Sequence, residues 1–263
     1  GLDINSSYLI YNLLNRQKEE GVAVISLDSP KNMNAMDGTL IAELIDAFNA
    51  AAADGTVRSI LLNSTGRAFC GGGDIGTMYK GVKAGKVDFA GEMRDAALIM
   101  KAMKSNPKPI VGAINGAAAG AGFILALGCD YVVADEKANF ICAFVNVGLV
   151  PDIGGVYVMT RALGASKAAE LAMTGRPVSA DEAKGLGFVA EIVAPDDLAE
   201  KSMKMAKRFA KGPALSYAKT KELIYRSQYV DFDDYMPAEV AAQVECMETQ
   251  DFCDRVIAFV EKK

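Results

Sequence analysis

Short apolar runs alternate with segments of helical periodicity through the first half of the chain. Apolar runs of strand length lie at 22–27, 58–63, 109–114 and 131–134. Apolar residues recur at helical spacing from Leu40 to Phe48, with Asp37 as a candidate N-cap, and a second helix is expected over 89–105. This alternation predicts an α/β fold with buried parallel strands. Residues 8–14 could add a hairpin strand beside 22–27.

The pattern becomes mainly helical after about residue 153. The expected helices cover 156–163, 166–173, 180–186, 196–211, 214–228, 231–247 and 249–261, and one more strand is expected at 188–193. No linker-like segment separates the two halves of the chain. We therefore divide it into a core at 1–195 and a C-terminal helical region at 196–263, within one continuous structural unit.

Composition and charge narrow the classes of partner. Of the 263 residues, 51% are hydrophobic, which is enough for a large core, and 28 basic against 33 acidic residues give a net charge of −5. A nucleic-acid-binding protein normally carries a basic surface, so nucleic acid is not the expected partner. Five scattered cysteines without CxxC spacing indicate free thiols in a reducing compartment. We see no signal peptide and no apolar stretch of membrane-spanning length, so we expect a cytoplasmic protein with no membrane partner.

The chain contains no histidine. Ser-His-Asp and Cys-His nucleophile systems and imidazole metal sites are therefore excluded, and we expect no metal. If the protein is an acid–base enzyme, its base is a carboxylate, or less often a lysine, tyrosine or cysteine.

Two glycine-rich loops follow apolar runs, at 64–76 and 115–123. The sequence "GGGDIG" in the first loop satisfies G-x-G-x-x-G, but it lies too far from the preceding strand for a dinucleotide site, so tight turns with positive φ explain it better. The small residues of the second loop either let a helix pack closely on a sheet or expose the amides of a helix N-terminus. Together the two loops could supply converging N–H groups for an oxyanion.

Asp152 stands in an apolar stretch, "GLVPDIGG" at 148–155. A carboxylate in such surroundings is costly unless something compensates it. The structural explanation is that Asp152 caps a helix that begins near Ile153, and from the residues alone this is the favoured one. The functional explanation is that its apolar neighbours raise its pKa and make it a stronger base.

Several motifs in order resemble the crotonase (enoyl-CoA hydratase/isomerase) superfamily over nearly the whole chain. They include "SPKNMNAM" at 29–36, "GRAFCGGGDI" at 66–75, "KPIVGAINGAAAGAGFILALGCD" at 108–130 and "GLVPDIGG". The resemblance implies a spiral of ββα units followed by a helical trimerisation region, assembled as a homotrimer or hexamer. It also implies an acyl-CoA thioester substrate, with no cofactor beyond its coenzyme A moiety.

The resemblance also assigns residues. The amides of Gly73 and Ala121 would polarise the thioester carbonyl. The stretches lining the coenzyme A site in relatives contain Lys31, Ala35, Gly71, Asp74 and Ile75 here. Lys31 could instead be a solvated turn residue, and Asp74 could simply brace its loop.

The chain departs from the two-glutamate pattern of the family's hydratases. Ile124 and Phe144 occupy the two glutamate positions, whereas Asp152 stands where certain isomerases carry a single acid. The segment "AFVNVGLVPDIGG" is most similar to single-aspartate enoyl-CoA isomerases of the phenylacetate-pathway type. We therefore expect Asp152 to move a proton from C2 to C4 of a 3-enoyl-CoA, giving the 2-enoyl-CoA through a thioester enolate.

Other functions stay open at this point. The protein could be an enoyl-CoA hydratase or have another crotonase activity, or bind CoA esters without turnover; an NAD-dependent oxidoreductase fits poorly. Tyr79, Glu92 and Arg94 lie in a region expected to cover the acyl pocket. Glu92 is a candidate second acid, although a solvated helix residue is the favoured interpretation.

Overall fold

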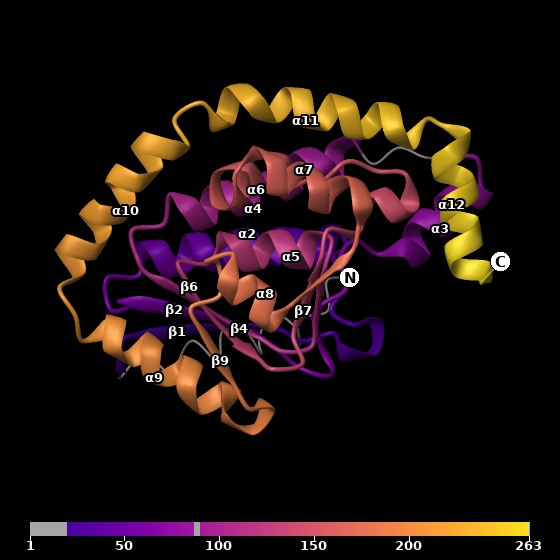
Figure 1. Ribbon diagram of the computed structural model, residues 1–263. Helices are drawn as coiled ribbons and strands as arrows, with labels where there is room; N and C mark the ends of the chain where they lie inside the picture. The colour runs from indigo at the N-terminus through magenta and orange to yellow at the C-terminus, as the bar shows by residue number, and fades with distance from the viewer. Residues whose placement is uncertain (1–19, 87–89, 263) are drawn as a thin grey trace.

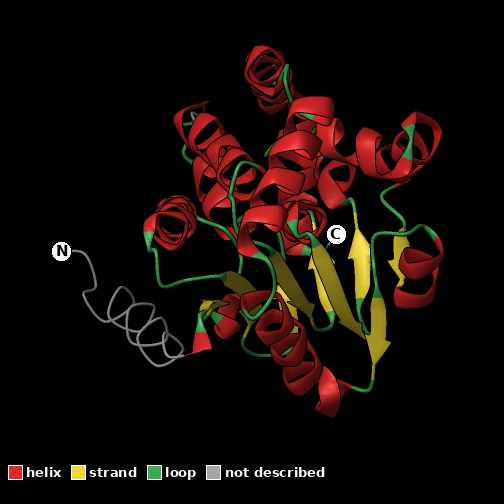
Figure 2. Cartoon of the chain, turned by 90° about the vertical axis from the view of Figure 1, so that its left-hand side faces the viewer, coloured by secondary structure: helices red, strands yellow, loops and turns green. Residues whose placement is uncertain are grey.

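A five-stranded, all-parallel sheet lies at the centre of the computed structural model, which describes residues 20–86 and 90–262 (Figures 1 and 2). Its strands, in spatial order, are β1 (Val22–Leu27), β2 (Ser59–Ser64), β4 (Ile110–Ile114), β6 (Tyr131–Asp135) and β9 (Glu191–Val193). The first four are the predicted apolar runs. They are mainly apolar because both faces of the sheet are covered; the polar exceptions include Ser59 and Asn63 of β2 and Asp135 of β6. The proposed hairpin strand at 8–14 lies outside the described residues.

A second, smaller sheet was not predicted from the sequence. It consists of β3 (Ala68–Cys70), β5 (Ala117–Ala119), β7 (Asn139–Ile141) and β8 (Pro177–Ser179), in that order. The first three run parallel, and β8 pairs with β7 in the antiparallel sense. Each of β3, β5 and β7 follows a strand of the large sheet and precedes a helix, so the chain repeats a strand–strand–helix unit.

Helices cover the two faces of the large sheet unequally (Figure 2). On one face, α9 (Leu198–Ala210) packs against β1, β2, β4 and β6. The main core lies on the other face. It contains buried side chains of α2 (Gly38–Ala53), α4 (Ala90–Lys104) and α5 (Ala121–Gly128). Asp37 caps α2 as predicted, since its side chain accepts a hydrogen bond from the Leu40 amide.

The remaining helices connect the sheets to a C-terminal arch. They are α3 (Ile75–Lys83), α6 (Gly155–Leu163), α7 (Ala165–Thr174), α8 (Ala180–Gly185), α10 (Ala214–Gln228), α11 (Phe232–Met247) and α12 (Gln250–Glu261), with short 3-10 turns η2 (Pro30–Asn32), η3 (Ala143–Val147) and η4 (Pro195–Asp197). Figure 1 shows α10 and α11 arching over the helical layer, and α12 packs against α3. The predicted helices after residue 153 are therefore confirmed. No helix of the described residues is long and apolar enough to cross a bilayer.

Candidate active site

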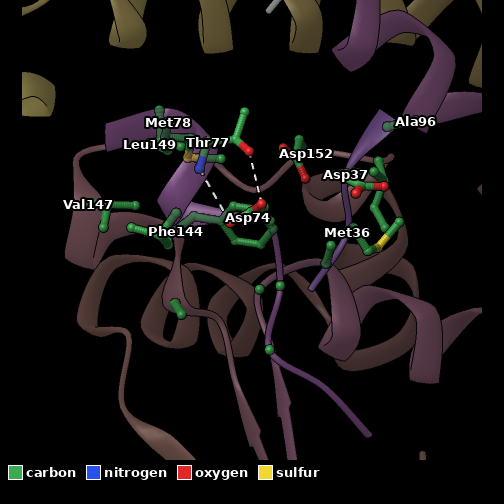
Figure 3. Close-up of a pocket in the computed structure, with 18 of the residues that line it drawn as sticks. Met36, Asp37, Asp74, Thr77, Met78, Ala96, Phe144, Val147, Leu149 and Asp152 are labelled. Atoms are coloured by element: carbon green, nitrogen blue, oxygen red, sulfur yellow. Dashed lines mark hydrogen bonds between the residues drawn. The ribbon is translucent and has the colours of Figure 1, made fainter. Parts of the chain in front are cut away.

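One cavity of about 430 Å³ opens where the two glycine-rich loops meet the loop after η3 (Figure 3). The described part of its lining is mostly apolar and contains three carboxylates, those of Asp37, Asp74 and Asp152. It includes Met36, Asp37, Thr39, Ile41, Gly71, Gly72, Gly73, Asp74, Ile75, Met78, Ala96, Gly120, Ala121, Phe144, Val147, Leu149, Asp152, Ile153 and Phe259. Segments far apart in the sequence thus contribute to a single pocket.

The first glycine loop is held in place by backbone hydrogen bonds to the segment before α2. The Met36 amide donates to the Gly72 carbonyl at 2.7 Å, and the Asp74 amide donates to the Met36 carbonyl at 3.0 Å. Gly72 has φ of +95°, a conformation that favours glycine. Asp74 then caps α3 by accepting hydrogen bonds from the Gly76 amide and the Thr77 amide and hydroxyl. The loop is therefore rigid on both sides of Gly73.

The second glycine loop packs backbone to backbone against the first. A Cβ on Gly72 would lie 3.0 Å from the Ala119 carbonyl oxygen, and one on Gly122 would lie 2.5 Å from that of Cys70. Close packing therefore explains the small residues, as one of the two interpretations predicted. The loop also exposes the N-terminus of a helix, because Ala121 is the first residue of α5 and lines the cavity.

The amides of Gly73 and Ala121 are available to a ligand. Within residues 20–86 and 90–262, neither donates a hydrogen bond to another protein group. Both residues line the cavity, and the Ala121 amide also has the positive end of the α5 dipole behind it. The two amides can therefore stabilise an oxygen that becomes negatively charged during a reaction.

Asp152 does not cap a helix, so the N-cap interpretation is wrong. The chain first turns through Ile153 at φ +53° and Gly154 at φ +79°, and α6 begins only at Gly155. Gly154 takes the N-cap position without any side-chain cap. A β-branched residue at positive φ is a strained conformation that its surroundings must hold. The turn leaves the Asp152 side chain facing the cavity instead of the helix (Figure 3).

Burial raises the pKa of Asp152 from its ordinary value of 3.8 to about 7. Its side chain is partly accessible from the cavity, although it lies deep inside the molecule. The Gln243 side chain opposes the rise, because its Nε2 donates a hydrogen bond to Asp152 Oδ2 at 3.1 Å. A carboxyl group with a pKa near neutrality can both accept and return a proton.

This pKa makes stability depend on pH in a direction opposite to that of most aspartates. The ionised form of Asp152 is disfavoured in the folded state, so ionisation lowers the free energy of unfolding. This loss is absent below about pH 4, grows between pH 4 and pH 7, and stays constant above that. The Asp152→Asn variant has no carboxyl group to ionise and therefore does not lose this stability. We expect the free energy of unfolding of the variant, relative to wild type, to be higher at pH 8 than at pH 5 by on the order of 2 kcal/mol. Urea titrations at both pH values would measure this, and an equal difference at the two values would contradict it.

The other two carboxylates of the lining are already engaged. Asp37 caps α2 and Asp74 caps α3, which agrees with the bracing role considered for Asp74. Among the lining residues that the structure describes, Asp152 is therefore the only acid not used to begin a helix. Ile124 is fully buried away from the cavity, whereas the Phe144 ring lines it.

The residues proposed for the coenzyme A site divide into two groups. Gly71, Asp74 and Ile75 line the cavity. Lys31 is exposed on η2 and Ala35 is half-buried, and neither lies in the cavity wall. Nothing in the structure tests their contact with a ligand, so all five assignments stay predictions.

Sequence reasoning missed two buried amides that shape the site. Asn34 is fully buried, and its Nδ2 donates to the carbonyls of Thr65, Ala68 and Phe69, which ties the segment before α2 to the first glycine loop. Gln243 is also fully buried. The motif "SPKNMNAM" contains Asn34, whereas Gln243 lies 91 residues after Asp152 and carries no local signal.

The region expected to cover the acyl pocket is only partly described. Tyr79 on α3 is half-buried and its hydroxyl donates to Glu261, which links α3 to α12. Arg94 is exposed on α4 and lies on a separate groove between α4 and α11. The Glu92 side chain lies outside those described, so its role as a second acid stays untested.

Comparison with known proteins shows which family the chain resembles. The sequence model described as enoyl-CoA hydratase/isomerase matches residues 17–263. The chain is 35% identical to a trans-2-decenoyl-[acyl-carrier-protein] isomerase of Streptococcus mutans over 97% of this chain and 95% of that protein. It is 34% identical to a probable enoyl-CoA hydratase of Rhodobacter capsulatus (96% of both chains) and 30% identical to the 1,2-epoxyphenylacetyl-CoA isomerase of Escherichia coli K12 (93% and 94%).

Similar solved structures carry the same family names. A crystal structure of an enoyl-CoA hydratase from Mycobacterium avium subsp. paratuberculosis superposes with a TM-score of 0.82 at 28% identity, covering 91% of this chain and 95% of that one. A putative enoyl-CoA hydratase/isomerase from Mycobacterium abscessus gives a TM-score of 0.75 at 33% identity, covering 93% and 94%. The repeated strand–strand–helix unit is therefore the crotonase-like spiral that the motifs implied.

Proposed function

Because the chain belongs to the enoyl-CoA hydratase/isomerase family, whose members act on acyl-CoA substrates, we propose that it shifts a double bond in an enoyl thioester. The substrate would be a 3-enoyl-CoA and the product the conjugated 2-enoyl-CoA, with the same chemistry available in reverse. One observation carries the proposal: among the lining residues that the structure describes, Asp152 is the single acid not engaged in capping a helix, and its pKa is about 7.

The first step of the proposed mechanism polarises the thioester. The amides of Gly73 and Ala121 donate hydrogen bonds to the thioester carbonyl oxygen. Asp152 removes a proton from C2, the electrons move into the carbonyl, and the enolate oxygen carries the charge that the amides stabilise. Each such donor contributes roughly 3–4 kcal/mol in comparable oxyanion holes.

The second step returns the proton. The carboxyl group of Asp152, now protonated, gives the proton to C4 as the electrons move back, and the double bond ends between C2 and C3. One acid that accepts and donates is sufficient, because no water is activated. Apolar residues around Asp152, including Phe144 and Leu149, keep water away from the enolate.

Hydration is the second candidate, because relatives at 32–34% identity are named probable enoyl-CoA hydratases. It is less well supported by the site. The positions of the two hydratase glutamates, as the family resemblance assigns them, are the apolar Ile124 and Phe144. A hydratase would have to activate water with Asp152 and protonate the product with another group.

We also propose that the protein needs no cofactor beyond the coenzyme A moiety and assembles as a homotrimer or hexamer through its C-terminal helices. Exposed apolar side chains on α10 support assembly: Leu215, Leu223 and Ile224. Light scattering of the purified protein would measure the oligomer mass.

The test of function is a spectrophotometric assay without added cofactor. Purified protein is mixed with a 3-enoyl-CoA, with a 2-enoyl-CoA, and with the matching acyl-carrier-protein thioesters, since one relative is named for such a substrate. Appearance of the conjugated thioester from the 3-enoyl-CoA supports isomerisation. Loss of conjugation through formation of a 3-hydroxyacyl product, without isomerisation, would establish hydration instead. Tight binding without turnover would point to a CoA-ester-binding protein.

A further inference from the structure

Helix α11 contacts the Asp152 loop through two buried polar side chains that are one helical turn apart. Glu239 is 5% exposed and Gln243 is fully buried. Glu239 Oε1 accepts a hydrogen bond from the Gly154 amide at 2.7 Å. Gln243 Oε1 accepts one from the Val150 amide at 3.0 Å. The loop that carries Asp152 is thus held on both sides of the aspartate by the same helix.

The orientation of the Gln243 amide is fixed by its partners. The Val150 N–H can only donate, so the oxygen of Gln243 must face it and the nitrogen must face Asp152. Gln243 Nε2 then donates to Asp152 Oδ2 at 3.1 Å. Among the described residues no other side chain hydrogen-bonds to this carboxylate, so the bond distinguishes its two oxygens.

We propose that Gln243 is a positioning residue for the proton shuttle: it fixes Oδ2 of Asp152 and leaves Oδ1 to exchange the proton with the substrate. This rests on the proposed isomerisation. Gln243 lies outside the cavity lining, so it would act only through Asp152. A carboxylate that must take a proton at C2 and deliver it at C4 works best when its reactive oxygen keeps one orientation.

Other titratable groups near Asp152 affect the expected pH dependence. Glu239 faces it from α11, and burial raises the pKa of Glu239 to about 8, with the charge of Asp152 adding to the rise. Cys142 lies just before η3 and is buried, with its pKa also raised. The Tyr235 hydroxyl donates a hydrogen bond to Glu239, and Arg161 on α6 stacks over the Tyr157 ring, which contacts the Tyr235 ring. The amide of Gln243 has no proton to lose, so it shifts the pKa of Asp152 only by hydrogen bonding.

The experiment compares Gln243→Leu and Gln243→Glu with wild type. Gln243→Leu removes the N–H group that donates to Asp152 and replaces it with a side chain of similar volume. Gln243→Glu keeps an acceptor for the Val150 amide but places a second carboxyl group beside Asp152. In both variants we expect kcat to fall about tenfold to a hundredfold with KM within threefold, because the lost bond is one to a charged group. The acid limb of the kcat–pH profile should move to higher pH, more so for Glu.

Glu239→Gln is the matched control, since it lies one turn away on the same helix and keeps an acceptor for the Gly154 amide. Because the pKa of Glu239 is about 8, its carboxyl group is mostly protonated while Asp152 titrates, so Gln in its place should leave the acid limb near its wild-type position, unlike the Gln243 variants. If Gln243→Leu and Gln243→Glu lower thermal stability but leave the acid limb in place, Gln243 is merely structural and the proposal is overturned.

A readout independent of turnover separates this proposal from the proposed function. The free energy of unfolding is measured between pH 5 and pH 8 for four proteins: wild type, Gln243→Leu, Asp152→Asn and the double variant. The effect of Gln243→Leu is thus obtained once with Asp152 present and once with Asn at position 152. If Gln243 and Asp152 interact as described, the effect of Gln243→Leu depends on pH only when Asp152 is present. That result would preserve the Gln243–Asp152 coupling even if no 3-enoyl-CoA were isomerised, whereas a pH-independent effect would refute it.

Discussion

Asp152→Asn is expected to lower kcat for 3-enoyl-CoA isomerisation by about a thousandfold. Asparagine has the same shape, and its carbonyl oxygen can accept the hydrogen bond from Gln243, but it cannot take a proton from C2. Substrate binding should change little, because the charge of Asp152 does not contact the thioester in the proposed mechanism. The measurement is the rate of appearance of the conjugated thioester, with wild type and variant side by side.

Asp196→Asn is the control for this variant, since Asp196 lies in η4 and does not line the cavity. It should retain wild-type rates. If Asp152→Asn turned over as fast as wild type, the base would lie elsewhere, and Glu92 would be the first residue to replace.

Ala121→Pro is expected to lower kcat by about a hundredfold to a thousandfold by removing one of the two amide donors. Proline fits the first position of a helix, where its missing N–H has no partner within the helix. The fold should therefore persist, with α5 beginning at the same residue. The measurement combines the isomerase rate with the melting temperature, so that loss of the donor can be separated from unfolding.

Ala165→Pro provides a matched control for that substitution. Ala165 is the first residue of α7, follows a glycine with positive φ as Ala121 does, and is exposed away from the cavity. It should keep full activity. Wild-type rates in Ala121→Pro would mean that the carbonyl is polarised by other groups.

The large sheet and the C-terminal helices were predictable because their signals are local. Strands such as β4 are continuous apolar runs buried on both faces, and long helices such as α9 have a clear periodicity. The strands of the small sheet are three residues long, too short for any period to be seen. Their existence depends on pairing between segments about 20–50 residues apart, as between β3 and β5.

The candidate site was predictable to the extent that motifs encode it. The two glycine loops, Phe144 and Asp152 all meet at the cavity. The conformation of Asp152 was not predictable, because the left-handed turn at Ile153 is unusual for a β-branched residue and displaces the helix start to Gly155. The hydrogen bond from Gln243 to Asp152 could not be predicted either, because it depends on how α11 packs against the loop that carries Asp152.

The strand–strand–helix repeat has a consequence for how such sites diversify. Gly73 follows the first described repeat of this kind, β2–β3; Ala121 follows the next, β4–β5; and Asp152 follows β6–β7. In the proposed mechanism, the groups that stabilise the anion and the group that moves the proton therefore lie in separate strand–strand–helix units, which come together only in the folded chain. Substitutions after β7 can exchange the acid without disturbing the amides, so one inherited scaffold can evolve new reactions while keeping its hold on the thioester.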